Sequence, residues 1–201
     1  MNTWIVTGGV TCGKSSFCRI VEKMCPNVEV FDCDGCVHEL LTRSSIVRRI
    51  SQAIGRGVVD REGGIDRSRL RELVFGDPAS RLVLEQILHP VVYNELSRAH
   101  VDASSDGGID LFVADVPLFF ESAPQGLKSD QVLVVAASRG VQVRRIEARS
   151  QGRIDRALAA EIVDAQMGIE HKVDRADRTL WNDGCRESFE RQAARLLELK
   201  K

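Results

Sequence analysis

Residues 8–15 carry the residue types and the spacing of a phosphate-binding loop. Their sequence, GGVTCGKS, matches the pattern GxxxxGK[ST], in which backbone N–H groups cradle a phosphate chain. Lys14 would reach the outer phosphates, and the hydroxyl of Ser15 would bind a magnesium ion carried by a nucleotide. The residues expected to surround the phosphates are Gly8, Gly9, Val10, Thr11, Cys12, Gly13, Lys14 and Ser15.

The segments on either side of this loop are those that the pattern requires. Residues 4–6 form a short apolar run that predicts a buried strand, and apolar residues recur at helical spacing after the loop. A strand, a glycine loop and a helix in this order aim the positive end of the helix at the phosphates. The alternative is a glycine-rich turn before an ordinary helix, and it is disfavoured because the strand, the lysine and the serine all agree.

Acidic residues follow two further predicted strands. The strand at 28–31 leads into Asp32 and Asp34, and the strand at 109–114 leads into Asp115. In an open parallel sheet, ligands bind at the carboxyl ends of the strands. Asp34 is expected to act as a base toward an acceptor hydroxyl, with Asp32 on the same side of the strand as its competitor; alternatively, both aspartates cap the next helix. Asp115 is expected to hold magnesium, directly or through water.

Residues 35–104 contain several helical pieces and no convincing strand, which predicts a helical insertion. Within it, His89 precedes Pro90. Proline disfavours helical backbone in the residue before it, so a helix break is expected there. His89 could present its ring to a cleft or serve a structural role, and the residues alone favour the structural role.

Residues 141–172 are predicted to form two helices joined by a basic turn at 151–153. Gln142, Arg145 and Arg149 follow one another at spacings of three and four, which places them on one face of the first helix. A basic face of this kind is usually solvated. Here it leads into a flexible turn, so the helix pair is interpreted as a lid whose arginines fold over transferring phosphates.

The alternation of predicted strands and helices indicates an α/β fold with a parallel sheet that is covered by helices on both faces. Further strands are expected at 131–136 and 178–181, and a closing helix follows them. The length suits one domain. Its expected parts are a core at about 1–34, 105–140 and 173–201, an insertion at about 35–104 and a lid at about 141–172.

The composition is that of a soluble globular protein, with 43% hydrophobic and 28% charged residues and a net charge of -1. This charge would recruit neither nucleic acid nor an anionic membrane non-specifically. We see no signal peptide and no membrane-spanning run, so a cytoplasmic protein is expected. The six cysteines are expected to be reduced thiols. Cys33 and Cys36 form a CxxC pair that could serve redox chemistry or bind metal, but packing is the preferred interpretation.

Seven ordered motifs cover nearly the whole chain. They are GGVTCGKS at 8–15, DCD at 32–34, LHP at 88–90, DVPLFFE at 115–121, Gln142 with Arg145 and Arg149, AD at 176–177 and NDG at 182–184. In this order they resemble the dephospho-coenzyme A kinase family. The resemblance implies a P-loop NTPase-type three-layer αβα fold with a five-stranded parallel sheet, a helical substrate-binding insertion and a two-helix lid.

The same resemblance implies an activity. It is the ATP-dependent phosphorylation of the ribose 3′-hydroxyl of dephospho-coenzyme A to give coenzyme A and ADP, the final step of coenzyme A synthesis. The expected small-molecule partners are ATP, with Mg²⁺, and dephospho-coenzyme A. Neither nucleic acid nor a membrane is expected as a partner, and a monomer is expected.

Roles for individual residues also follow from the resemblance. Asp34 would be the base, and the cationic catalytic residues would be Lys14, Arg145 and Arg149. Asn182 would lie near the nucleotide base, so that the ATP-binding set comprises the loop residues together with Ser16 and Asn182. The acceptor-binding residues would be Asp32, Asp34, His89 and Pro117, and the metal ligands would be Ser15 and Asp115.

Two loop residues depart from the family pattern, which commonly has Gly-Ser where this chain has Thr11 and Cys12. Because threonine has a branched Cβ, we expect ordinary backbone dihedrals at Thr11. The N-terminus of a helix lowers the pKa of a thiol, so we expect Cys12 to be modifiable and to be protected by ATP.

Other functions share some of these features. Another small-molecule kinase would have the same loop, core and lid and a different acceptor. A GTP-dependent switch is disfavoured because Asn182-Asp183-Gly184 lacks the lysine of a guanine-reading turn. A thiol redox or metal protein would depend on Cys33 and Cys36.

Overall fold

The computed structural model describes residues 1–122 and 128–198. Residues 123–127 and 199–201, which fall within the predicted core, lie outside the described residues. The chain divides into two compact units, and each is described here by itself. The first comprises Met1–Asp32 and His100–Lys201, and the second comprises Cys33–Ala99.

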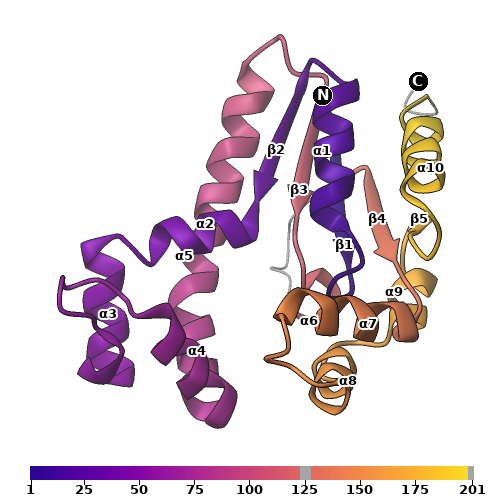
Figure 1. Cartoon of the computed structure of the whole chain (residues 1–201). Coiled ribbons are helices and arrows are strands. Elements are labelled where there is room, and N and C mark those ends of the chain that lie inside the picture. Colours follow the sequence, from indigo (N-terminus) through magenta and orange to yellow (C-terminus); the bar gives the residue numbers. More distant parts are fainter. Residues whose placement is uncertain (123–127, 199–201) are drawn as a thin grey trace. The chain divides into compact units, whose positions relative to one another are not determined.

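Five parallel strands form one sheet in the first unit (Figure 1). The strands are β1 (Asn2–Gly8), β2 (Val28–Asp32), β3 (Leu111–Asp115), β4 (Gln131–Ala136) and β5 (Arg178–Trp181). Their order in the sheet is β2-β3-β1-β4-β5, so β1 is the central strand. The loop that follows β1 therefore leaves the middle of the sheet. This topology confirms the predicted α/β fold with a five-stranded parallel sheet.

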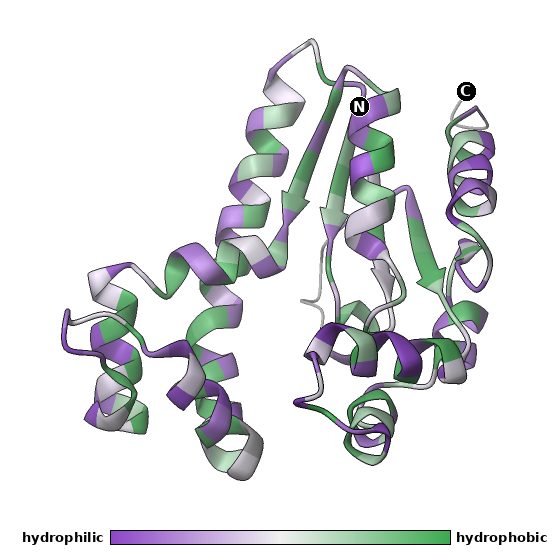
Figure 2. Ribbon diagram, in the orientation of Figure 1, coloured by the Kyte–Doolittle hydropathy of each residue, from purple (hydrophilic) through white to green (hydrophobic). Residues whose placement is uncertain are grey.

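The inner strands β3, β1 and β4 are largely apolar and buried because both faces of the sheet are covered there. All five residues of β3 are buried, as are the last six residues of β1. In Figure 2, β4 is coloured as hydrophobic along most of its length, whereas α10 alternates between hydrophilic and hydrophobic bands. This difference separates a strand that is enclosed on both faces from a helix with one solvent face.

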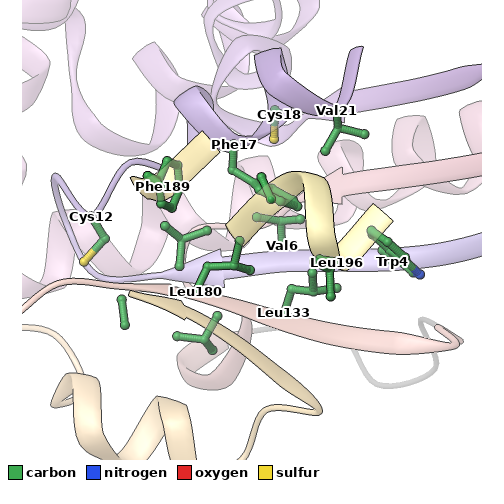
Figure 3. Packing of buried hydrophobic residues seen from close by; sticks show 14 of the residues in the cluster. Trp4, Val6, Cys12, Phe17, Cys18, Val21, Leu133, Leu180, Phe189 and Leu196 are labelled. Atoms are coloured by element: carbon green, nitrogen blue, oxygen red, sulfur yellow. The ribbon is translucent and has the colours of Figure 1, made fainter. Parts of the chain in front are cut away.

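Helices α1 (Lys14–Met24) and α10 (Arg186–Glu198) cover the face of the sheet that carries Trp4 and Val6. Figure 3 shows Phe17 of α1 and Phe189 of α10 packed among these strand residues. Phe17 has no exposed surface. Burial of a side chain of this size stabilises the fold by roughly 2–3 kcal/mol.

The opposite face of the sheet is contacted by the end of the long helix α5 (Pro78–Ser105). The His100 ring lies edge-on to the ring of Phe112 in β3, with their centroids 5.2 Å apart. Nε2 of His100 is also 2.9 Å from Oγ1 of Thr3 in β1. Helical residues therefore contact both faces of the sheet, which agrees with the predicted three-layer arrangement.

The remaining helices of the first unit follow β3 and β4 in the chain. They are α6 (Phe119–Ser122), α7 (Arg139–Ser150), α8 (Arg156–Asp164) and α9 (Ile169–Asp174). A small apolar cluster around Val143, Ile146 and Ala159 joins α7 to α8. A two-bond ion pair also links Arg139 of α7 to Asp164 of α8, at 2.7 and 2.6 Å.

The second unit is helical. It contains α2 (Cys33–Leu40), α3 (Ser44–Ile54), a short 3-10 helix (Arg56–Val58), α4 (Arg67–Gly76) and the first part of α5. The carboxylate of Asp66 caps α4 by accepting the N–H groups of Ser68 and Arg69. Arg43, just before α3, forms an ion pair at 2.5 Å with Glu95 of α5.

Two local predictions in this region are wrong. The expected helix break at His89-Pro90 is absent, because α5 is a single helix of 28 residues that includes Pro90. Proline removes one backbone hydrogen bond from a helix, but Leu88 and Val92 on either side are buried and hold the helix together. Asp34 does not extend the strand beyond Asp32; it lies in the first turn of α2. Since a helix rotates by about 100° per residue, the two carboxylates do not share one side of a strand.

No helix in the described part of the chain is long and apolar enough to cross a membrane. All six cysteines are free thiols. Cys33 is buried and Cys36 is half-buried within α2. Among the residues that the structure describes, no group of three or more His, Cys, Asp or Glu side chains is arranged to hold a metal ion.

Candidate functional site

The glycine-rich loop between β1 and α1 has the backbone of a phosphate cradle. Gly8 has φ 151°, and a Cβ there would collide with the carbonyl oxygen of Val135 in β4. Gly13 has φ 105° and precedes α1, and its carbonyl oxygen accepts the N–H groups of Ser16 and Phe17. The two glycines thus allow the chain to turn tightly and to present the N-terminus of α1 to the loop.

Thr11 contradicts the prediction of ordinary dihedrals, because its φ is 55°. A left-handed conformation costs a residue with a Cβ about 1–2 kcal/mol. Two hydrogen bonds offset this cost. Oγ1 of Thr11 donates to the carbonyl oxygen of Gln142 at 3.1 Å, and the carbonyl oxygen of Thr11 accepts Nη1 of Arg145 at 3.1 Å. Threonine therefore takes a position where glycine would fit because α7 binds its hydroxyl.

Cys12 contradicts the prediction of a lowered thiol pKa. Its side chain has no exposed surface, and burial raises the pKa of its thiol. The charges of Lys14 and Arg145 act in the opposite direction but do not outweigh the loss of hydration. Cys12 is thus a packed residue of the loop, and its burial argues against a reactive thiol.

Lys14 and Ser15 begin α1 at the mouth of the loop. Nζ of Lys14 donates to the carbonyl oxygen of Gly9 at 3.3 Å, so the ammonium group turns back over the loop. Ser15 is exposed. Both residues are where a phosphate-binding loop requires them.

Asp115 ends β3 beside this helix. Cys18, one turn after Ser15 in α1, donates from Sγ to Oδ2 of Asp115 at 3.9 Å. The pKa of the Cys18 thiol is raised, first by burial and then by the charge of Asp115. Residues three apart share a helix face, so Ser15 lies on the face that meets Asp115. A hydroxyl and a carboxylate are the hard oxygen donors that Mg²⁺ prefers, and these two residues therefore fit the expected metal.

Asp32 and Pro117 also lie at the carboxyl edge of the sheet. Asp32 of β2 is directly opposite Asp115 of β3 in the strand register. The carbonyl oxygen of Pro117 accepts the hydroxyl of Thr7 in β1 at 3.2 Å. The structure thus gathers these predicted residues around the end of the central strand.

Arg145 of α7 binds two backbone carbonyl groups. Nη1 donates to Thr11, and Nη2 donates to Asn182 at 2.7 Å. Asn182 follows β5, and its own Nδ2 donates to the carbonyl oxygen of Cys12 at 2.8 Å. Gln142, one turn before Arg145, is buried and donates to the carbonyl oxygen of Ala137. Arg149, one turn after, is exposed.

A cavity of about 560 Å³ opens beside the loop. Thr11, Gly13 and Ser16 line it from the loop and α1, Arg145 and Arg149 line it from α7, and Asn182 lines it from the turn after β5. The cavity is large enough for a nucleoside and carries two of the predicted cationic residues. Four residues of the predicted ATP-binding set, Thr11, Gly13, Ser16 and Asn182, therefore line one cavity.

Comparison with known proteins agrees with this site. The family model for dephospho-CoA kinase, CoaE, matches residues 4–187. The chain belongs to the dephospho-CoA kinase family.

Individual relatives support this membership. The dephospho-CoA kinase of Carboxydothermus hydrogenoformans is 34% identical over 194 residues, which are 96% of this chain and 91% of that protein. The crystal structure of TT1252 from Thermus thermophilus has a TM-score of 0.78 and 29% identity, and the match covers 98% of this chain and 97% of that one. Shikimate kinase from Acinetobacter baumannii, at 16% identity and a TM-score of 0.56 over 99% of this chain and 92% of its own, shares the fold.

Two residues that the family resemblance implicates lie in the second unit. Asp34 is exposed in the first turn of α2. His89 is half-buried in α5, with its ring 5.7 Å from that of Tyr93. Their contact with an acceptor stays a prediction.

Sequence reasoning missed an ion pair in this dephospho-CoA kinase family member. Nζ of Lys172 in α9 has no exposed surface and lies 2.7 Å from Oε1 of Glu121 in α6. Lys172 also donates to the carbonyl oxygen of Gly8 at 3.3 Å. One signal was available in the sequence. Lys172 stands between Ile169 and Val173 at helical spacing, where an apolar residue is expected.

Proposed function

We propose that this protein transfers the γ-phosphoryl group of ATP to the ribose 3′-hydroxyl of dephospho-coenzyme A, giving coenzyme A and ADP. This reaction is the final step of coenzyme A synthesis. The observation that carries the proposal is the family match over residues 4–187. The phosphate loop and the cavity beside it agree with a nucleoside triphosphate as the donor of the phosphoryl group.

Residues of the loop and of α7 would neutralise the negative charge of the ATP phosphates. We assign the phosphates to the loop, Ser16 and the ammonium group of Lys14, and the nucleoside to the cavity beside Asn182. Arg149 reaches this cavity as an exposed cation that can meet developing charge. Arg145 orients the loop through its two carbonyl contacts. Bound Mg²⁺ would supply further charge neutralisation, held by Ser15 and Asp115.

Acceptor activation is assigned to Asp34. Its carboxylate would accept the proton of the 3′-hydroxyl as the phosphoryl group is transferred. Asp32, His89 and Pro117 would bind the acceptor. We assign the second unit to acceptor binding and the α7–α8 pair to a lid. We further propose a monomer that works in the cytoplasm, where ATP is available and thiols stay reduced.

The test is an assay of ATP consumption with dephospho-coenzyme A and, in parallel, with adenosine, with AMP and without acceptor. We expect consumption with dephospho-coenzyme A alone and a product that carries phosphate on the 3′-hydroxyl. Consumption with only another acceptor would keep the nucleotide site and overturn the acceptor assignment of Asp34 and His89. Slow hydrolysis that is indifferent to acceptors would point to a nucleotide switch.

A further inference from the structure

A glutamine from the turn between α8 and α9 occupies one of the N–H groups of the phosphate loop. Oε1 of Gln166 accepts the backbone N–H of Val10 at 3.0 Å. The side chain of Val10 also packs against the apolar cluster that joins α7 to α8. N–H groups of such loops bind phosphate oxygens, so Gln166 holds a position that an anionic oxygen would take.

The position of Lys14 shows which phosphate this would be. Its ammonium group lies 3.3 Å from the carbonyl oxygen of Gly9, and this carbonyl belongs to the same peptide group as the N–H of Val10. The lysine of a phosphate loop reaches the β- and γ-phosphates. The Gly9–Val10 peptide therefore lies at the outer end of the phosphate chain, and Gln166 stands at the place of a terminal phosphate oxygen.

The buried ion pair holds this turn in place. The N–H of Met167, next to Gln166, donates to Oε1 of Glu121 at 3.2 Å, and Glu121 pairs with Lys172. Lys172 in turn donates to the carbonyl oxygen of Gly8, two residues before Val10. A buried ion pair is a weak source of net stability, because desolvation opposes the attraction. Here it fixes the distance between the turn and the loop.

A small cavity provides space for the glutamine to move. It has a volume of about 180 Å³ and is lined by Gly9, Gln142, Gln166 and Gly168, among others. A side chain that leaves the N–H of Val10 can turn into this space while the backbone of Met167 stays bound to Glu121.

We propose that Gln166 competes with the terminal phosphate of ATP for the N–H of Val10 and so weakens the preference of the loop for ATP over ADP. The inference rests on the proposed nucleotide site. With ADP bound, the glutamine keeps its hydrogen bond. With ATP bound, the γ-phosphate displaces it. Gln166 is thus a positioning residue that acts through Val10, and it lowers the affinity for ATP relative to that for ADP.

Calorimetric titration of the full chain with ADP and with the β,γ-imido analogue of ATP, both with Mg²⁺, tests this proposal. Gln166→Ala removes the competing acceptor. It should raise the analogue-to-ADP affinity ratio roughly 2- to 10-fold, the range to which the net free energy of one hydrogen bond converts. Gln166→Glu keeps an acceptor for Val10 and repels phosphate, so it should lower the ratio by at least as much. Glu161→Gln, an exposed change on α8, is the matched control and should leave the ratio unchanged.

The two variants of Gln166 should therefore move the ratio in opposite directions. A ratio that is unchanged in both variants would overturn the proposal. Equal weakening of both nucleotides would also overturn it, because that result indicates a purely structural glutamine. If Gln166→Ala does not fold, Gln166→Glu still tests the proposal. An analogue-to-ADP affinity ratio that does not fall in this variant would overturn it. A wild-type chain that binds neither nucleotide would instead refute the proposed nucleotide site, and the two failures are distinct.

Discussion

Nη2 of Arg145 donates a hydrogen bond to the backbone carbonyl oxygen of Asn182 over 2.7 Å. This contact fastens α7 to the turn after β5, and the second contact of the guanidinium group, to Thr11, fastens α7 to the phosphate loop. An arginine that sequence reasoning assigns to transferring phosphates therefore has a structural task as well. Mutation can compare this arginine with Arg149, which is exposed on the same helix.

Arg145→Ala should lower the free energy of unfolding by about 1–3 kcal/mol, because it removes two hydrogen bonds from a charged donor. It should also raise the KM for ATP, since the loop loses a support. Arg149→Ala should lower kcat and leave stability unchanged, because the side chain is exposed. Urea unfolding and steady-state kinetics measure both effects. Arg144→Ala, an exposed change on the same helix, is the control. If Arg144→Ala destabilises the protein as much as Arg145→Ala does, the hydrogen bonds of Arg145 are not the cause of the loss.

Asp34→Asn should keep nucleotide binding and reduce kcat by roughly 10²- to 10⁴-fold, as expected for the loss of a general base. Lys14→Ala should instead abolish transfer by removing charge at the outer phosphates. Nucleotide titration and turnover with dephospho-coenzyme A distinguish the two variants. Normal turnover of Asp34→Asn would shift the role to Asp32 or to simple positioning.

Thr11→Val should destabilise the protein by about 1 kcal/mol, because it keeps the strained backbone and removes the hydroxyl that bonds to Gln142. Thr11→Ser retains the hydroxyl and should be close to the wild type. Thr11→Gly should also be nearly neutral, since relief of the left-handed conformation offsets the lost hydrogen bond. The midpoints of thermal unfolding of the three variants and the wild type measure this order of stability. A valine variant as stable as the serine variant would show that the hydroxyl contributes nothing.

Thiol labelling should modify Cys185 first, because it is exposed. Cys12 and Cys18 are buried and should react only when the chain unfolds. ATP should therefore have no direct effect on the labelling of Cys12. Peptide mass spectrometry after brief alkylation identifies the sites. Rapid labelling of Cys12 in the native protein, suppressed by ATP, would restore the reactive thiol that sequence reasoning proposes.

Stability should decline in alkaline solution through the same two buried thiols. Burial raises the pKa of Cys12 and Cys18 above the ordinary value of 9.0. As the pH rises past that value, the unfolded chain loses these protons before the folded chain does, so the free energy of unfolding falls. Below that value this contribution is fully present.

Urea unfolding between about pH 7.5 and 10.5 measures this decline. Cys18→Ala should make it shallower, whereas Cys185→Ser should not change it. Equal slopes for the wild type and Cys18→Ala would exclude the thiol of Cys18 as a source of the pH dependence.

The sheet and the loop could be predicted because their signals are local. A buried strand such as β4 is a continuous apolar run, and the loop pattern follows β1 directly. The location of Asp115 at a strand end follows from the same reasoning. Each of these features needs only neighbouring residues to be recognised.

The errors share the opposite property, since they depend on residues far away in the chain. The backbone of Thr11 is settled by Gln142 and Arg145, and the thiol of Cys12 is buried by packing that no local pattern reveals. The helix continues through Pro90 because tertiary packing buries Leu88 and Val92 beside it. The ion pair joins Lys172 to Glu121, which lies 51 positions earlier in the chain.

The central place of β1 has a consequence for how the chain folds during synthesis. Its first residue in the sheet, Asn2, pairs with Leu111, so the strand that is made first lacks both neighbours until more than half of the chain exists. At ordinary rates of translation this delay is on the order of ten seconds. The loop waits longer still, because three of the side chains that hold it, those of Gln166, Lys172 and Asn182, come after the first four strands of the sheet, and Asn182 comes after the fifth as well. We therefore expect a ribosome-bound fragment without these residues to have no organised phosphate loop, although it contains the entire motif.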